Sequence, residues 1–209
     1  MDEMDFGSLL SWIADDTDHQ NLIRQLANLD NKAKQYGISF ILETDLPPER
    51  NAALMEKMRG LSVGLNFDMG NSAYWGFDPD HELPLIGMWI KNVHVKDCTP
   101  KDYTLPLGDG DVDFRKVFIH LKNQNYDGLF ILQAAPAPPG EEKEIAKKYF
   151  QFTQNQLDNY YYESGSNDYS RINGTENNGS VNRTPDTEDL GIKNLGYLNN
   201  TNEYFTVQF

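Results

Sequence analysis

The sequence predicts an α/β fold in which four βα units follow one another, half of the eight units in a closed (β/α)8 barrel. Short apolar runs alternate with segments of helical periodicity along about 160 of the 209 residues. Strands that alternate with helices pair in parallel, and strands covered on both faces are apolar almost throughout. The polar residues that end these runs are therefore the first candidates for chemistry.

Four apolar runs are expected to be the strands of one parallel sheet. They are Ile38–Glu43, Val63–Asp68, Ile90–Lys96 and Leu129–Gln133. Helical segments are expected around and between them, at about 22–33, 48–59, 79–89, 114–125 and 141–162. Gly37 is placed to end the first helix and Pro47-Pro48 to open the second, as these residue types commonly do.

The composition changes at Ser164, after which Asn, Gly, Ser, Thr and Asp dominate to about Asp189. Such a segment has too little apolar surface to offset the entropy lost on ordering. We expect a half-barrel domain over residues 1–162 and a polar, low-complexity tail over 163–209 that is mostly disordered. Near the end of this tail, Tyr204–Phe209 could form a strand.

The overall charge restricts the partners and the compartment. The net charge of −14 opposes binding to nucleic acid or to an anionic membrane, since both require clustered Lys and Arg. No apolar run approaches the ~18 residues that span a bilayer, and the acidic start, Met1–Asp5, lacks the basic residues of a signal peptide. The single Cys98 excludes an internal disulfide and suits a reducing compartment, so a cytoplasmic location is expected.

Four polar residues lie at the carboxyl ends of the predicted strands. The carboxyl ends of parallel barrel strands meet at one mouth, which here would receive Glu43, Asp68, His94 and Gln133. Two carboxylates, an imidazole and an amide suit a divalent ion such as Mn²⁺, Mg²⁺, Co²⁺ or Zn²⁺. The alternatives are turn or helix-entry carboxylates, a hydrogen-bonded core histidine, and a core or substrate-binding amide.

Further residues near the same mouth are candidates for substrate contacts. Lys96 would neutralise an oxyanion or a phosphate, unless it forms a surface ion pair with Asp97. Asn71 would contact substrate, unless it serves only as a turn residue. The backbone N–H groups of Gly108 and Gly110 could bind an anion, although a bare turn is the alternative.

Four segments resemble the sugar-phosphate isomerase/epimerase family, which has the xylose-isomerase-like TIM barrel also used by endonuclease IV. They are Leu42–Pro48, Asn66–Ser72, Asn92–Asp97 and Pro106–Phe114, within a resemblance that covers roughly residues 17–155. The four strands then correspond to strands five to eight of the barrel. The first half of the barrel is not represented.

The resemblance implies a ligand set for one divalent metal, made of a Glu, an Asp, a His and a second Glu. Glu43, Asp68 and His94 match the first three, while Gln133 stands at the fourth position. Family epimerases use their two glutamates as acid and base, and an amide cannot take a proton at neutral pH. They also tend to have a histidine where this chain has Asn71, so both departures weaken a two-base epimerase.

These observations predict a metal-dependent isomerase or epimerase that acts on a sugar or sugar phosphate through an enediolate. Glu43 would be a ligand and the general base, and Lys96 would offset the developing negative charge. A metal-dependent phosphodiesterase would need more ligands and is opposed by the net charge. A non-catalytic half-barrel remnant or partner-binding fragment is the other alternative. Because four strands leave open edges, a second copy or an N-terminal half-barrel is the expected protein partner.

Overall fold

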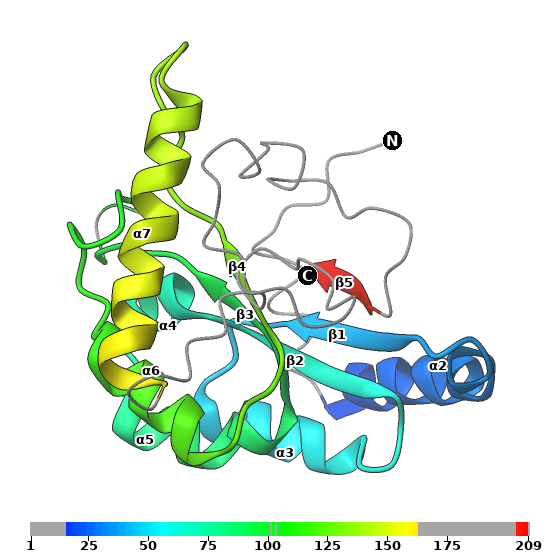
Figure 1. Cartoon of the computed structure of the whole chain (residues 1–209). Coiled ribbons are helices and arrows are strands. Elements are labelled where there is room, and N and C mark those ends of the chain that lie inside the picture. The colour runs from blue at the N-terminus through cyan, green and yellow to red at the C-terminus, as the bar shows by residue number, and fades with distance from the viewer. Residues whose placement is uncertain (1–15, 101, 103, 163–203, 209) are drawn as a thin grey trace.

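The computed structural model describes residues 16–100, 102, 104–162 and 204–208, which form one sheet with helices along it (Figure 1). The strands are β1 Ser39–Glu43, β2 Val63–Asp68, β3 Ile90–Val95, β4 Leu129–Leu132 and β5 Tyr204–Gln208. The helices are α2 Asp16–Gln35, α3 Pro48–Lys57, α4 Met69–Trp75, α5 Pro79–Ile86, the 3-10 turn η1 Gly87–Trp89, α6 Phe114–Asn123 and α7 Glu142–Tyr160.

All neighbouring strands are parallel, in the order β4-β3-β2-β1-β5. The four predicted strands and their parallel pairing are therefore confirmed, and they form a partial barrel. The possible strand near the C-terminus is also present, because β5 pairs with β1 from Ser39↔Tyr204 to Glu43↔Gln208. The remainder of the predicted tail, 163–203 and 209, lies outside the described residues.

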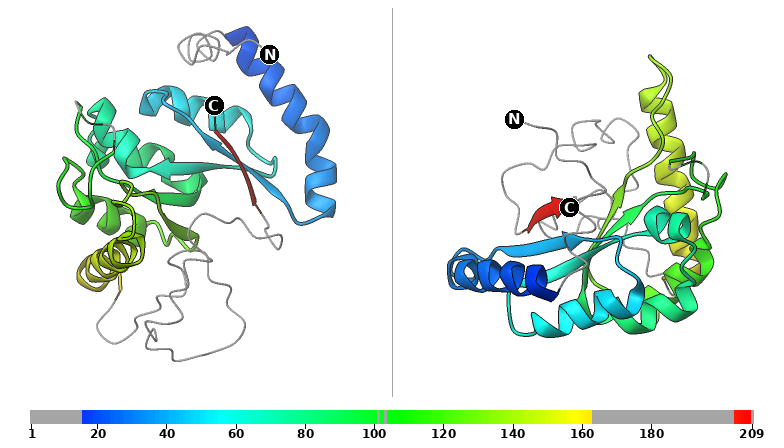
Figure 2. Two further views of the ribbon diagram at one scale, coloured as in Figure 1. Left: turned by 90° about the horizontal axis from the view of Figure 1, so that it is seen from above. Right: turned by 180° about the vertical axis from the view of Figure 1, so that it is seen from behind.

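The helices α3, α5, α6 and α7 follow one another along one face of the sheet, while α2 lies beside β1 (Figures 1 and 2). Alternate strand residues point toward these helices, and Leu42, Leu65, Phe67, Val93 and Phe130 are almost completely buried there. The register pairs Leu42 with Leu65, Phe67 with Val93, and Val93 with Phe130, so these side chains form one continuous apolar layer.

The opposite face carries the polar residues, and an irregularity in the pairing decides which of them meet. Leu65 pairs with Ile90, but the next residue, Asn66, pairs with Asn92, so that Lys91 is an extra residue in β3. Gly64 leaves room for this bulge, since a Cβ there would lie 2.3 Å from Lys91 Cγ. As a consequence β2 and β3 place polar residues side by side.

One helix was not expected from the sequence. Asn71, for which a turn was the alternative to substrate contact, lies together with Gly70 in α4. The Asp68 side chain accepts a hydrogen bond from Asn71 N and so caps this helix. Gly76, in the left-handed conformation, ends it. Within the described part of the chain, no helix is long and apolar enough to cross a membrane.

The aromatic cluster around Phe130 should hold the sheet to its last helices. Phe130 is fully buried, with ring centroids 5.5 Å from Phe118, 5.3 Å from Tyr126 and 5.5 Å from Tyr161. We expect Phe130→Ala to lower the free energy of unfolding by about 3–5 kcal/mol, because a large side chain is removed from a packed core. Urea unfolding measures this. Met88→Ala is the control, since Met88 is 62% exposed and its removal should change stability by less than about 0.5 kcal/mol.

Candidate metal centre

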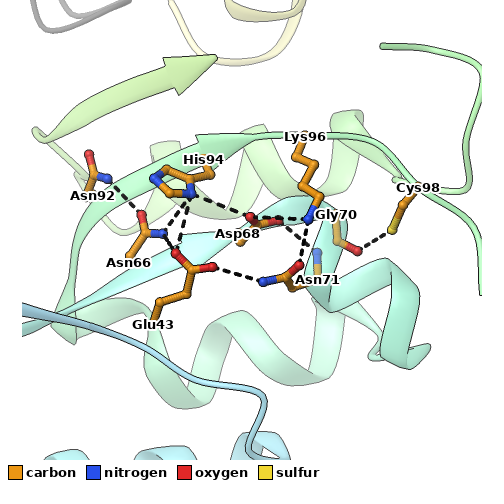
Figure 3. A network of polar contacts seen from close by, with 9 residues as sticks. All are labelled: Glu43, Asn66, Asp68, Gly70, Asn71, Asn92, His94, Lys96 and Cys98. Carbon is orange, nitrogen blue, oxygen red and sulfur yellow. Dashed lines mark hydrogen bonds and ion pairs between the residues drawn. The ribbon is translucent and has the colours of Figure 1, made fainter. Parts of the chain in front are cut away.

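Three of the predicted ligands converge at the carboxyl ends of adjacent strands (Figure 3). Glu43 ends β1, Asp68 ends β2, and His94 is the penultimate residue of β3. Asp68 and His94 are paired across the sheet, which places both side chains on the same face. One ligand atom from each of the three residues lies within 4.8 Å of the others. The side chains of Glu43, Asp68 and His94 thus lie close together, as the sequence predicts.

The spacing of the ligand atoms fits a single divalent ion. His94 Nδ1 lies 3.5 Å from Glu43 Oε2 and 3.5 Å from Asp68 Oδ2. Two ligand atoms that share one ion at ~2.1–2.4 Å and at right angles are about 3.0–3.4 Å apart, so both pairs that include His94 already have nearly this spacing. Two carboxylate oxygens and an imidazole nitrogen suit Mn²⁺, Co²⁺ or Zn²⁺.

The two oxygens of Asp68 have different surroundings. Oδ1 accepts the 2.8 Å hydrogen bond from Asn71 N that caps α4. Oδ2 is buried and accepts no hydrogen bond from any residue in the described ranges. A buried carboxylate oxygen that accepts no hydrogen bond is unfavourable unless positive charge lies near it, and the Lys96 ammonium 3.9 Å away supplies part of that charge. Because no donor occupies Oδ2, this oxygen stays available to a metal ion and supports a metal site here.

Asn71 and Lys96 connect the ligands to one another. Asn71 Nδ2 donates to Glu43 Oε1 at 3.1 Å, and Lys96 Nζ donates to Asn71 Oδ1 at 2.9 Å. Lys96 Nζ is also 3.9 Å from Asp68 Oδ2. Its stem passes directly over Gly70, where a Cβ would lie 2.6 Å from Lys96 Cγ. Contact of Asn71 or Lys96 with substrate stays a prediction.

Gln133 follows β4 directly, and its N–H donates to Val95 O at 3.1 Å. Ile131 pairs with His94, so Gln133, two residues further on, faces the same side of the sheet as His94. Its Oε1 is buried and accepts no hydrogen bond from the described residues. Its place as a fourth ligand or a substrate contact stays a prediction.

The glycine loop is engaged within the protein. Asp97 Oδ2 accepts hydrogen bonds from Gly108 N at 2.8 Å and Gly110 N at 3.0 Å, and Asp97 Oδ1 accepts one from Val112 N at 3.2 Å. In this structure these N–H groups therefore donate to the carboxylate of Asp97, and contact of Gly108 or Gly110 with a substrate anion stays a prediction. Asp97 and Lys96 are both buried, so the alternative of a surface ion pair is wrong.

The surroundings of Cys98 make its thiol unreactive. It is buried, and its Sγ donates to Gly70 O at 2.5 Å. Burial raises its pKa to about 11, despite the opposing effect of Lys96. At neutral pH the nucleophilic thiolate is therefore scarce.

Two residues of the site were missed by the sequence analysis. Asn66 Nδ2 donates to Glu43 Oε2 at 2.5 Å and lies 3.0 Å from His94 Nδ1, while Asn92 Nδ2 donates to Asn66 Oδ1 at 2.8 Å (Figure 3). The available signal was their position, because each is two residues before a predicted ligand, Asp68 or His94, and so shares its face of the strand.

A second buried carboxyl group lies close to this site. Glu82 of α5 accepts a hydrogen bond from the Ser72 hydroxyl of α4, and one pocket is lined by both Glu82 and Glu43. Burial raises the pKa of Glu82 to about 7, against the smaller opposing effects of Ser72 and His81. Glu82 was not singled out from the sequence, because its burial depends on how α4 and α5 pack.

The partial barrel and its Glu-Asp-His cluster define a class, the α/β barrels with a polar site at the carboxyl ends of their strands. Residues 7–155 match the family described as Xylose isomerase-like TIM barrel. This match covers well over half of the chain, and the chain belongs to that family. The resemblance to sugar isomerases and epimerases is thereby confirmed.

Relatives and a solved structure agree with this assignment. An inosose dehydratase of Clostridium perfringens is 26% identical over 166 residues, 66% of this chain and 56% of that protein. An L-ribulose-5-phosphate 3-epimerase of Salmonella paratyphi A is 37% identical over 67 residues, 32% of this chain and 24% of that protein. The crystal structure of a D-allulose 3-epimerase from Methylomonas sp. superposes with a TM-score of 0.58 at 18% identity, over 69% of this chain and 57% of that one.

The superposition on the D-allulose 3-epimerase structure, at 18% identity, shows the fold alone. The chain spans about half the length of the first curated relatives it matches, 51% and 56%. What those proteins do as wholes therefore bears on this chain only as a proposal.

The burial of Glu82 should make stability depend on pH in a defined direction. Its pKa rises from 4.5 to about 7 on folding, so the folded state binds the proton more tightly than the unfolded state. The stabilisation that protonated Glu82 contributes to folding is fully present below about pH 4.5. It is lost as the pH rises through about 7, where the buried carboxyl group ionises. We expect Glu82→Gln, which mimics the protonated form, to gain about 2–3 kcal/mol relative to wild type between pH 4.5 and pH 8.

Urea unfolding of the metal-free proteins at several pH values measures this difference. Glu144→Gln is the control, because the Glu144 side chain is 68% exposed and pairs only at the surface with Lys147. Its difference from wild type should not change with pH. A Glu82→Gln variant that loses stability relative to wild type as the pH rises would contradict the assigned burial.

Proposed function

We propose that this chain carries the metal-dependent proton-transfer site of an isomerase or epimerase acting on a sugar or sugar phosphate. The observation that carries the proposal is the cluster of Glu43, Asp68 and His94, in which Asp68 Oδ2 is buried without a hydrogen bond from the described residues. These three side chains would hold the ion. When bound, a divalent ion supplies positive charge that stabilises the negative oxygens of an enediolate.

Glu43 is the proposed general base as well as a ligand. Both of its oxygens accept hydrogen bonds from amides, Oε1 from Asn71 and Oε2 from Asn66, so the carboxylate is fixed in one orientation. A fixed carboxylate beside the metal position can remove the proton from the carbon next to the substrate carbonyl. The proton then returns to the neighbouring carbon, or to the other face of the same carbon if a second acid is supplied.

Lys96 is the proposed electrostatic partner of this step. Its ammonium group is buried and lies 3.9 Å from Asp68 Oδ2, on the side of the site where the ligand carboxylates gather. A buried cation that is held in place stabilises charge that develops in the transition state more than a solvated one would. Lys96 would therefore favour the enediolate over the neutral substrate.

Gln133 favours isomerisation with one base over epimerisation with two. Its amide neither gives nor takes a proton at neutral pH, so it can bind a metal or a substrate hydroxyl but cannot serve as the second acid. The relative named as an L-ribulose-5-phosphate 3-epimerase supports a sugar phosphate as the class of substrate. Because the chain spans half of its relatives, we propose that turnover needs further substrate-binding loops, from a second copy or from an N-terminal half-barrel.

Proton abstraction can be tested without knowing the product. In D₂O with Mn²⁺, ketose phosphates should acquire deuterium at the carbon next to the carbonyl, which proton NMR detects. We expect Glu43→Gln to slow this exchange about 10²–10⁴-fold, because the amide cannot act as a base. Glu49→Gln should exchange at the wild-type rate, since Glu49 is exposed and pairs with His81 outside the site.

Metal binding is measured separately by titration calorimetry with Mn²⁺. Wild-type protein that binds Mn²⁺ but exchanges no proton from pentulose or hexulose phosphates, alone or as an assembled oligomer, would contradict the proposed reaction. In that case the metal centre would still be supported, but the proposed isomerase reaction would not.

A further inference from the structure

A chain of two asparagines links the predicted ligands on the side away from Asn71. Asn92 Nδ2 donates to Asn66 Oδ1 at 2.8 Å. The Asn66 amide nitrogen in turn lies 2.5 Å from Glu43 Oε2 and 3.0 Å from His94 Nδ1 (Figure 3). Asn66 is buried, and its one amide group thus contacts two of the three ligand atoms.

The orientation of the Asn66 amide follows from its partners. Its oxygen must face the Asn92 amide hydrogens, and its nitrogen must face the Glu43 carboxylate, which accepts only. The opposite orientation would set two oxygens against each other at Glu43 and two N–H₂ groups against each other at Asn92. The Asn66 amide nitrogen therefore faces Glu43 Oε2 and His94 Nδ1, and in the tautomer that carries no proton on Nδ1 the imidazole accepts a hydrogen bond from this amide.

We propose that Asn66 is a positioning residue that assembles the metal ligands before the metal binds, by holding Glu43 Oε2 and His94 Nδ1 in place. The inference rests on the proposed metal centre. In the metal-free protein the amide keeps these two atoms 3.5 Å apart, close to the spacing that a shared ion requires. With an ion bound, His94 Nδ1 would give its single lone pair to the ion and no longer to the amide, whereas Glu43 Oε2 could keep its hydrogen bond from Asn66.

Asn92 supports the ligands indirectly, through its hydrogen bond to Asn66. Its own side chain reaches neither ligand in the contacts of Figure 3, but its hydrogen bond fixes which end of the Asn66 amide faces them. The pairing of Asn66 with Asn92 exists because Lys91 is bulged out of β3. Loss of Asn92 should therefore act through Asn66 and have a smaller effect.

A purely structural role for Asn66 predicts a different result. A buried amide that serves only packing would lower stability when it is removed and leave the metal affinity of the folded protein unchanged. A positioning role lowers the affinity even where the protein is fully folded, because supporting hydrogen bonds to metal ligands typically change affinity 10–100-fold.

The test is titration of the full chain with Mn²⁺ by calorimetry, at a temperature where circular dichroism shows every variant folded. We expect Asn66→Ala to weaken binding about 10–100-fold and Asn92→Ala to weaken it less. Thr153→Ala is the control. Thr153 is fully buried, and its hydroxyl donates to Tyr149 O within α7, so its removal takes away a buried polar group without touching the ligands and affinity should be unchanged.

A folded Asn66→Ala variant that binds Mn²⁺ as tightly as wild type would overturn the inference and leave the metal centre intact. Wild-type protein that binds no Mn²⁺ would overturn the metal centre itself, and the inference with it. If Asn66→Ala does not fold, nitrogen NMR of metal-free wild-type protein decides. An unprotonated Nδ1 on neutral His94 supports the inference, and a proton on Nδ1 overturns it.

Discussion

The carboxylate of Asp68 is the group on which the rest of the site depends, because its two oxygens act on different structures. Oδ1 caps α4, and this cap begins the helix immediately after β2. The first turn of α4 then carries Asn71 into contact with Glu43 and Lys96. Oδ2 faces His94 and Lys96. One side chain thus determines both the local backbone and the position of the charged groups.

The register between β2 and β3 is the second constraint. If the pairing were regular, with Lys91 opposite Asn66, Asp68 would pair with Val93, and His94 would point toward the helices. The bulge moves Val93 and Val95 to the buried apolar layer and places His94 opposite Asp68. A deviation from regular pairing beside a functional site is common, because it redirects single side chains without disturbing the sheet.

The sequence predicts the strands and three of the ligands because both follow from local patterns. Apolar runs define the strands, and the parallel arrangement brings their polar ends together. The supporting residues follow from no such pattern. Asn66 and Asn92 are ordinary strand asparagines until the bulge pairs them. The bonds from Asp97 to the glycine loop span 11 to 15 residues, so no short motif records them.

The position of the ligands within the sheet separates metal binding from turnover. Glu43, Asp68 and His94 come from three adjacent strands, and their hydrogen-bonding partners, Asn66, Asn71, Asn92 and Lys96, all lie within the same βα units. β5 covers the far edge of β1, so the ligand strands form the interior of the sheet. The proposed ligands therefore all come from described strands, although the chain spans half the length of its relatives. A sugar substrate is larger than an ion and would contact several barrel loops at once. If the proposed centre binds a metal, that affinity would belong to this half of a barrel, whereas specificity for a sugar would require the loops of a complete one.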